Sequence, residues 1–202
     1  RQIGFRAGVP DSVPAMTVNR ACGSGLQAMV DIARGIRHGE IEVGLAGGTE
    51  SMSRLPFFLT GFRDGYRLGH GEVVDAMYKD GFLCPLSNML MGETAEVLAD
   101  RYGIPRREQD EYAVETQRRC EAARRAGRFA DEMVPVELSE RGKTTPFATD
   151  EHPRDGATVE GMAKLPPVFR KEGTVHAGNS SGITDGAAAA VLASGEAVKR
   201  HG

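Results

Sequence analysis

A cysteine flanked by glycine stands between a segment with strand character and a segment with helical character, in residues 19–25 (Asn-Arg-Ala-Cys-Gly-Ser-Gly). Residues 15–19 contain β-branched side chains and follow a proline, which favours a strand. After the cysteine, apolar side chains recur at helical spacing until the pattern ends near Gly39. The sequence therefore predicts a strand, then a tight turn that carries Cys22, and then a helix.

A second apolar run at residues 41–46 ends at Gly47 and Gly48 and predicts a strand after the helix. Two parallel strands need a crossover connection, and a strand, helix and strand in this order form a βαβ unit. We therefore expect an α/β layer in which Cys22 lies at the carboxyl end of a strand. Ligands usually bind at that end of the strands in α/β proteins.

The turn alone leaves two interpretations of Cys22 open. Unpaired N–H groups at a helix N-terminus stabilise a thiolate, and Gly23 and Gly25 leave room for a substrate. A thiolate in this position is a nucleophile, and the amide of Cys22 would donate to an oxyanion formed by its attack on a thioester. Free cysteine is also among the most buried residue types, so a structural role in the core is equally consistent with these seven residues.

From about residue 55 to residue 175 the character changes, because Gly, Pro and charged residues are mixed with aromatic and methionine positions. We expect an inserted subdomain with helices at 92–102 and 106–126, and Cys120 on the apolar face of the second helix is expected in the core. Arginines and acidic residues are interleaved along that helix and just after it, which favours a solvated face over a phosphate site. These residues are Arg106, Arg107, Arg118, Arg119, Arg124, Arg125 and Arg128, with Glu108, Asp110, Glu111, Glu115 and Glu121. Residues 134–138 are expected to be extended, and the run from there to Pro167 is more typical of loop than of sheet.

Composition and charge exclude several classes of protein. A net charge of -3 and a pI near 6.0 give no reason to expect nucleic acid or an anionic membrane as a partner. The three cysteines are widely spaced, which argues against a disulfide framework and a zinc site and favours a reducing compartment. The five histidines form no pair at metal-ligand spacing, so no metal is expected. No membrane-spanning run is visible in the sequence.

Three motifs together resemble the signatures of the thiolase family. They are residues 19–25, residues 46–53 (Ala-Gly-Gly-Thr-Glu-Ser-Met-Ser) and residues 177–189 (Ala-Gly-Asn-Ser-Ser-Gly-Ile-Thr-Asp-Gly-Ala-Ala-Ala). Segments 128–135 and 164–171 extend the resemblance over nearly the whole chain. β-Ketoacyl synthases share the fold and a nucleophilic cysteine turn, but they do not share this set of motifs.

The resemblance implies an α/β, thiolase-like layered fold, in which a βαβ core carries an inserted α-rich loop domain. Residues 1–54 would belong to the N-terminal core domain with its nucleophile turn, and residues 55–175 to the loop domain that binds coenzyme A. Residues 176–202 would return to the core domain. On this basis we predict that 187–194 is a core strand, although its four alanines taken alone favour a helix.

The resemblance also assigns site residues. Cys22 would be the catalytic nucleophile. Six further positions match those that surround coenzyme A or the acyl group in thiolases: Arg154, Ser181, Phe169, Ala177, Phe82 and Met91. A guanidinium is suited to adenine or phosphate, and a serine hydroxyl to a pantetheine amide. His176 matches a variable position of the family, so we do not expect it to be the general base.

The implied activity is acyl transfer between 3-ketoacyl-CoA and coenzyme A, which gives acetyl-CoA and a shortened acyl-CoA through an acyl-cysteine intermediate. This is a reversible Claisen condensation of the kind used in fatty acid β-oxidation. Coenzyme A is then a substrate, no permanently bound cofactor is expected, and the protein would be a homodimer or homotetramer. Alternatives are an acetoacetyl-CoA-specific acetyltransferase and a non-catalytic acyl-CoA-binding fragment. Leu90 argues against the first, because acetoacetyl-CoA thiolases tend to carry histidine there.

Several thiolase segments do not occur in these 202 residues: an Asn-Glu-Ala-Phe segment, a Gly-His-Pro segment and a second cysteine beside a glycine run. The chain also opens at Arg1 rather than at a methionine. We therefore expect the sequence to be a piece of a longer enzyme and to be inactive alone. We expect the protein in the cytoplasm, or in mitochondria if a targeting segment has been removed.

Overall fold

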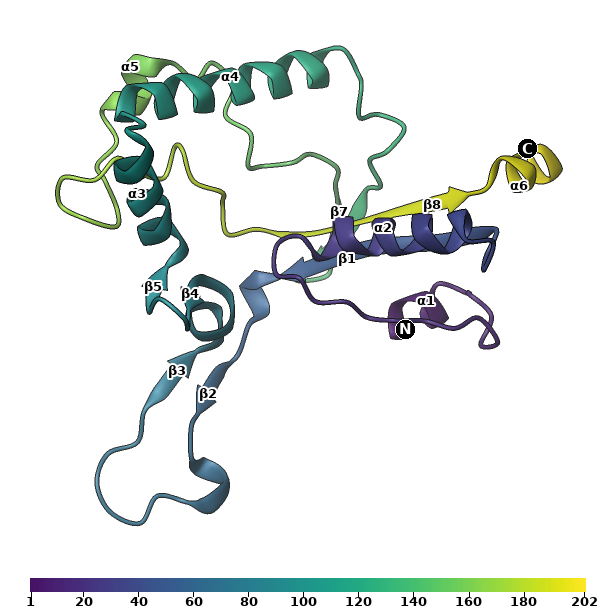
Figure 1. The fold of residues 1–202 in the computed structure, drawn as a ribbon, viewed down its shortest axis with the longest axis horizontal. Helices are drawn as coiled ribbons and strands as arrows, with labels where there is room; N and C mark the ends of the chain where they lie inside the picture. Colours follow the sequence, from purple (N-terminus) through teal and green to yellow (C-terminus); the bar gives the residue numbers. More distant parts are fainter. The chain divides into compact units, whose positions relative to one another are not determined.

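The computed structural model describes residues 1–202 (Figure 1). The chain folds into two compact units. The first unit consists of Arg1–Pro56 and Thr184–Gly202, so the two ends of the chain belong to the same unit. The second unit is the continuous segment Phe57–Ile183.

The first unit is built on two long strands and one long helix. Strand β1 (Val43–Ser51) pairs with β8 (Asp185–Ala193) in antiparallel register, from Val43 opposite Ala193 to Ser51 opposite Asp185. Helix α2 (Ser24–Arg37) lies along this pair (Figure 1). Three short elements complete the unit: α1 (Gln2–Arg6), the 3₁₀ turn η1 (Met52–Arg54) and α6 (Gly195–His201).

Most of the predicted elements of this unit are confirmed. The helix after Cys22 ends at Arg37, and the alanine-rich segment forms β8 rather than a helix. The strand predicted at 15–19 is wrong, because these residues are mostly exposed and only an isolated bridge between Arg20 and Cys22 occurs nearby. β-Branched residues form a strand only when a neighbour supplies hydrogen bonds, and no strand of this chain pairs with 15–19. The first strand of the expected βαβ unit is therefore not formed.

Small residues bring the helix and the strands of this unit close together. A Cβ added to Gly44 would lie 2.6 Å from the side chain of Ile32 in α2, and one added to Gly47 would lie 2.8 Å from the carbonyl oxygen of Ala188 in β8. Gly47 and Gly48 therefore fit within the strand, and β1 continues through them to Ser51, whereas the sequence predicts that the strand ends at these glycines.

The second unit contains three helices and three short antiparallel hairpins. The helices are α3 (Met91–Tyr102), α4 (Arg106–Arg125) and α5 (Val159–Ala163), and α5 packs against α4 (Figure 1). Strand β2 (Phe57–Leu59) pairs with β3 (Val73–Asp75), β4 (Leu83–Cys84) with β5 (Met89–Leu90), and β6 (Val136–Glu140) with β7 (Lys143–Phe147). The 3₁₀ turn η2 (Phe62–Asp64) and the π-helical turn η3 (Met77–Phe82) lie within and after the first hairpin.

Both long helices of this unit were predicted within one residue of their observed bounds, and their ends have clear causes. The Glu93 side chain accepts a hydrogen bond from the backbone N–H of Leu90 at 2.6 Å, which caps the start of α3. Gly103 ends α3 in the left-handed conformation with φ of 64°. The start of α4 follows Pro105, whose fixed φ favours a helix N-terminus.

Part of the run predicted as loop forms a strand instead. β6 and β7 are joined by Arg141 and Gly142, both with positive φ, at 48° and 80°. This is the backbone conformation of a tight two-residue hairpin turn, for which a glycine is favourable. The prediction was wrong for residues 143–147 because a glycine such as Gly142 can mark either a loop or a tight hairpin turn, and only the loop was considered.

The interior of the second unit is partly polar. Small and apolar side chains such as Ala99, Ala113 and Met162 are buried together with Glu96, Asp110 and His176. The solvated face predicted for α4 is therefore wrong at Asp110, which has 1% of its surface exposed. Its neighbours on the outer side form exposed pairs such as Arg107–Glu111, as expected. No helix is both long and apolar enough to cross a membrane.

Candidate active site

Cys22 lies in a tight turn that the local sequence holds in place. The Asn19 side-chain oxygen accepts a hydrogen bond from the backbone N–H of Ala21, which adopts a left-handed conformation with φ of 47°. The Ser24 hydroxyl donates to the carbonyl oxygen of Ala21 at 2.7 Å and accepts from the N–H of Arg20 at 2.8 Å. A left-handed alanine is unfavourable, so side-chain hydrogen bonds on both sides are needed to maintain it. The turn leaves Cys22 exposed to solvent.

The cysteine immediately precedes the N-cap of α2, which is Gly23. The first N–H groups of a helix have no partner within it, and those of Gly25 and Leu26 donate to no acceptor in the chain. These groups and the helix dipole favour negative charge at the N-terminus of α2. An exposed thiol in this position is suited to act as a thiolate nucleophile rather than as a core residue.

The second motif lies directly beside this turn. A Cβ added to Gly48 in β1 would lie 3.4 Å from the Cα of Gly25 in α2. A side chain at residue 48 would therefore press on the first turn of the helix that follows Cys22. The Gly-Gly pair of β1 allows the strand and the start of α2 to approach each other at the Cys22 turn.

The third motif is connected to the second through Asp185. One carboxylate oxygen of Asp185 accepts a hydrogen bond from the backbone N–H of Ser53 at 2.9 Å, and the other accepts one from the Ser53 hydroxyl. Hydrogen bonds from Ser53 hold the pKa of Asp185 below its ordinary value. The ends of β1 and β8 are thereby joined, and the first unit gathers residues from all three motifs.

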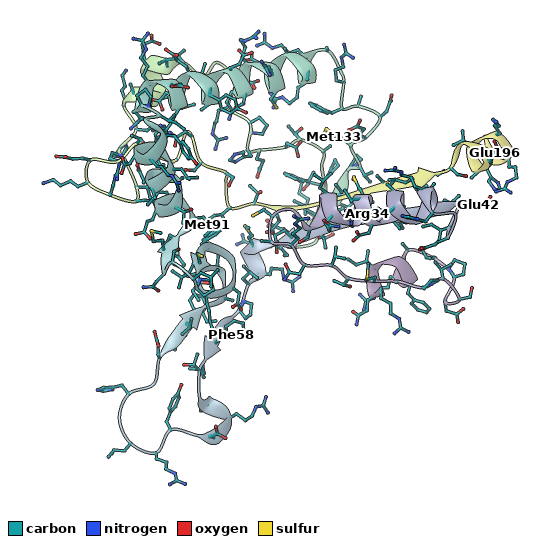
Figure 2. All side chains as sticks on the ribbon, in the orientation of Figure 1. Arg34, Glu42, Phe58, Met91, Met133 and Glu196 are labelled. Carbon is teal, nitrogen blue, oxygen red and sulfur yellow. The ribbon has the colours of Figure 1, made fainter.

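In the second unit, three of the predicted coenzyme A residues lie around the start of α3. Leu83 pairs with Leu90, so Phe82 and Met91 flank this pair on adjacent chain segments. Met91 lies at the N-terminal end of α3 (Figure 2). The ring of Phe169 packs on Gly92, since a Cβ added there would lie 2.0 Å from it. Residues separated by almost eighty positions thus meet at one helix end.

Glu96 on α3 organises the loop at 173–175. Glu96 is buried, with 3% of its surface exposed. Its carboxylate accepts hydrogen bonds from the backbone N–H groups of Thr174 and Val175, each at 2.8 Å, and from the Thr174 hydroxyl at 3.0 Å. Burial raises the pKa of Glu96, but these hydrogen bonds and the charge of Arg170 outweigh that effect and leave the pKa below its ordinary value. The loop is therefore attached to α3 by a buried carboxylate.

Asp110 on α4 holds the next part of the same loop. Its carboxylate accepts from Nε of Arg106 at 2.9 Å and lies 2.7 Å from Nε2 of His176, which is fully buried. The guanidinium of Arg106 also donates to the carbonyl oxygens of Met162 and Leu165, at 2.7 and 3.0 Å. The buried charge of Asp110 thus has two hydrogen-bond partners, the cationic guanidinium of Arg106 and the ring of His176.

Arg154 and Ser181 lie on two exposed loops that contact each other. The backbone N–H of Arg154 donates to the Gln117 side chain of α4 at 2.9 Å, and its guanidinium donates to the carbonyl oxygen of Glu151 at 2.7 Å. The His152 ring packs on Gly182, where an added Cβ would lie 2.4 Å away. The segment that carries Arg154 therefore touches the segment that carries Ser181.

A cavity of about 610 Å³ lies between one face of α4 and these loops. Its lining includes the half-buried thiol of Cys120 and the Ser180 hydroxyl, which is buried and has no hydrogen-bond partner in the protein. The sulfur expected in the core thus borders an open space. No group of three or more His, Cys, Asp and Glu side chains in residues 1–202 is arranged to hold a metal ion.

The predicted site residues divide between the two units. Cys22 belongs to the first, and the six residues assigned to coenzyme A belong to the second. Within the second unit, contacts connect Phe82, Met91 and Phe169 around α3, and hydrogen bonds connect the loop of Ala177 to α3 and α4. The roles assigned to these residues stay predictions.

The sequence reasoning missed the residues that support the site. Glu96, Arg106, Asp110 and Asp185 each hold a loop or strand end through buried or well-directed hydrogen bonds. Asp185 lies in the third motif, but that motif alone gives it no role. Glu96 and Asp110 have other charged residues near them in their helices, so the residue type alone does not mark them as buried. The only available signal is their position on the same helix face as the apolar residues.

Comparison with known proteins gives a consistent result. The family model "Thiolase, N-terminal domain" matches residues 1–196. An acetyl-CoA acetyltransferase of Pseudomonas aeruginosa is 48% identical over 203 residues, covering 100% of this chain and 52% of that protein. The mitochondrial 3-ketoacyl-CoA thiolase of Bos taurus is 45% identical over 201 residues, covering 100% of this chain and 51% of that protein.

Solved structures agree with this. The crystal structure of human mitochondrial 3-ketoacyl-CoA thiolase in complex with CoA matches with a TM-score of 0.89 and 44% identity, over 99% of this chain and 50% of that chain. The predicted α/β, thiolase-like fold is thereby confirmed. The chain spans about half the length of the relatives that it matches.

Proposed function

The chain belongs to the thiolase family, and on this premise we propose that the whole protein is an acetyl-CoA C-acyltransferase. It would transfer the acyl group of a 3-ketoacyl-CoA to coenzyme A and release acetyl-CoA, and it would catalyse the reverse condensation as well. The observation that carries this proposal is the exposed thiol of Cys22, held by the Asn19–Ser24 turn at the N-terminus of α2.

The reaction has two half-reactions. The thiolate of Cys22 adds to the keto carbon, and the adjacent carbon–carbon bond then breaks. Its electron pair leaves with acetyl-CoA as an enolate, which takes up a proton. In the second half-reaction the thiol of coenzyme A attacks the acyl-Cys22 thioester, forms the shortened acyl-CoA and releases the Cys22 thiolate. The amide of Cys22 donates to the oxygen that gains charge.

We assign the proton transfers to a histidine and a second cysteine that the family resemblance puts outside these 202 residues. His176 does not take this role, because its ring is fully buried and both of its nitrogens lie within hydrogen-bond distance of protein partners.

Coenzyme A would be held by the second unit. Met91 and Phe82 would contact the acyl end, and Phe169 and Ala177 would pack against the pantetheine. Ser181 would bond a pantetheine amide, and Arg154 would bind adenine or phosphate at the nucleotide end. Support comes from the contacts that gather Phe82, Met91 and Phe169 around the start of α3, and from the hydrogen bond that attaches the segment of Arg154 to α4. A thiolase structure in complex with CoA among the structural neighbours supports coenzyme A as a substrate.

The substrate range proposed here is 3-ketoacyl-CoA esters rather than acetoacetyl-CoA alone. Leu90 stands where acetoacetyl-CoA thiolases tend to carry histidine, and relatives with both names match at similar identity. Values of kcat/KM for 3-ketoacyl-CoA esters of four to sixteen carbons test this choice. Activity that falls sharply beyond four carbons would instead favour the acetoacetyl-CoA-specific enzyme.

The alternative outside the enzymes is a non-catalytic acyl-CoA-binding protein. Thiolysis of a 3-ketoacyl-CoA by the full-length protein separates the two, with Cys22→Ser as the test variant and Cys120→Ser as a matched control. We expect Cys22→Ser to lose at least about a thousandfold in kcat, since a hydroxyl at this position is a far weaker nucleophile. Cys120→Ser should stay within about twofold of the wild-type kcat. Near-normal turnover by Cys22→Ser would contradict the proposed mechanism.

We also propose a homodimer or homotetramer in the cytoplasm, or in mitochondria. The family resemblance supports the oligomeric state, and three free cysteines agree with a reducing compartment. Light scattering of the full-length protein tests the oligomeric state, and a monomeric mass would contradict it.

A further inference from the structure

The loop at 173–182 has a buried side and an exposed side. Val175 and His176 are buried, whereas Ala177 and Ser181, which the proposed function assigns to coenzyme A, are exposed. Contacts that fix the buried side therefore constrain Ala177, which directly follows His176, and restrict where Ser181 lies five residues further along the loop.

The hydrogen bonds of His176 determine its tautomer. The backbone N–H of Gly178 donates to Nδ1 at 3.0 Å, so Nδ1 carries no proton. Nε2 must then be the protonated nitrogen, and it donates to the Asp110 carboxylate at 2.7 Å. The His176 ring thus connects Asp110 on α4 to the backbone of Gly178, and each ring nitrogen has one partner.

Packing and further hydrogen bonds make this connection specific. A Cβ added to Gly178 would lie 2.4 Å from Sδ of Met162 and 3.0 Å from Cε1 of His176, so the backbone of the loop is in close contact with the ring. The backbone N–H of His176 donates to the Asn179 side chain at 2.8 Å, and Asn179 donates back to the carbonyl oxygen of Thr174 at 3.0 Å. The turn at 176–179 is therefore held at its first residue, its third and its fourth.

We propose that His176 is a positioning residue for coenzyme A, because its ring bridges Asp110 and the Gly178 amide and so fixes Ala177 and Ser181 in the conformation that binds the pantetheine. The proposal rests on the proposed function. It assigns His176 to binding and not to proton transfer, because the ring is buried and both nitrogens are occupied. Loss of the bridge should weaken coenzyme A binding while the chemistry at Cys22 continues once substrate is bound.

Three variants of the full-length protein separate the two hydrogen bonds. His176→Phe keeps the ring and removes both bonds. His176→Asn has an oxygen close to the position of Nδ1 and keeps only the acceptor for Gly178, and His176→Gln has an amide nitrogen close to Nε2 and keeps only the donor to Asp110. Arg107→Met is the matched control, because it removes an exposed ion pair from the same helix.

The measurements are the KM for coenzyme A and kcat in thiolysis, the Kd for coenzyme A by calorimetry, and the rate of Cys22 alkylation by iodoacetamide. We expect His176→Phe to raise KM and Kd about tenfold, with kcat and the alkylation rate within about twofold of wild type. The Asn and Gln variants should lie between His176→Phe and wild type. They also keep the test decisive if His176→Phe does not fold. Arg107→Met should match wild type.

An unchanged KM and Kd in the His176 variants would overturn the inference, and so would a fall in kcat at unchanged KM. Failure of the proposed function gives a different result, because the wild-type protein would then perform no thiolysis, whether or not it binds coenzyme A. If the wild-type protein binds coenzyme A and performs thiolysis, and the His176 variants have the same KM and Kd as wild type, only the role proposed for His176 is wrong.

Discussion

Glu96 and Asp110 carry buried carboxylates, with 3% and 1% of their surfaces exposed. A buried carboxylate is tolerated only when hydrogen-bond donors and a compensating charge replace the lost water. Glu96 obtains these from the loop at 174–175 and from Arg170, and Asp110 obtains them from Arg106 and His176. Each carboxylate therefore connects a helix to the loop of Ala177 and Ser181.

Arg106→Met should destabilise the protein, because it leaves the buried charge of Asp110 without its cation. We expect a loss of about 3 kcal/mol, measured by urea unfolding of the full-length protein at neutral pH. Arg107→Met on the exposed side of the same helix should cost less than about 0.5 kcal/mol. Equal effects of the two substitutions would show that the Arg106–Asp110 pair adds nothing to stability.

Glu96 gives stability a defined pH dependence. Its pKa is lower in the folded state than its ordinary value of 4.5, so its contribution is complete above pH 4.5 and is lost as the pH falls through the folded-state pKa. Glu96→Gln should therefore be less stable than wild type at pH 7, by about 2 kcal/mol, and the difference should narrow below pH 4.5. Urea midpoints at several pH values measure this. A difference that stays constant with pH would exclude the ionised carboxylate as the cause.

At the scale of elements, the sequence predicted those whose determinants are local. The helices α2, α3 and α4 follow from apolar periodicity and from end signals such as Gly103 and Pro105. Residues 15–19 have the composition of a strand but no partner in this chain, and partners are not visible in local composition. The strand β8 depended on the family resemblance, since its alanines taken alone favour a helix.

The junction of β5 and α3 depends on a glycine. A Cβ at residue 92 would overlap the ring of Phe169, so Gly92→Ala should displace Phe169. We expect the KM for coenzyme A to rise severalfold and the stability to fall by about 2 kcal/mol. Gly195→Ala is the control, because no atom lies within 4 Å of a Cβ added there. If Gly92→Ala keeps the wild-type KM, Phe169 does not contribute to binding.

At the scale of the whole molecule, the three motifs indicated the family, and the structure shows why they recur together. Gly48 lies beside the first turn of α2, and Ser53 bonds Asp185, so residues far apart in sequence meet in the first unit. The supporting network in the second unit could not be predicted in the same way. Its members come from helices and loops whose pairing is a property of the folded chain, and single charged residues give no signal of burial.

The most direct test of the account is acylation of the full-length protein by acetyl-CoA, followed by mass spectrometry of the intact chain and of its peptides. We predict a single acetyl group on Cys22, none on Cys84 or Cys120, and its loss when coenzyme A is added. Absence of acetylation, or acetylation at another residue, would contradict the claim that Cys22 is the nucleophile of a thiolase.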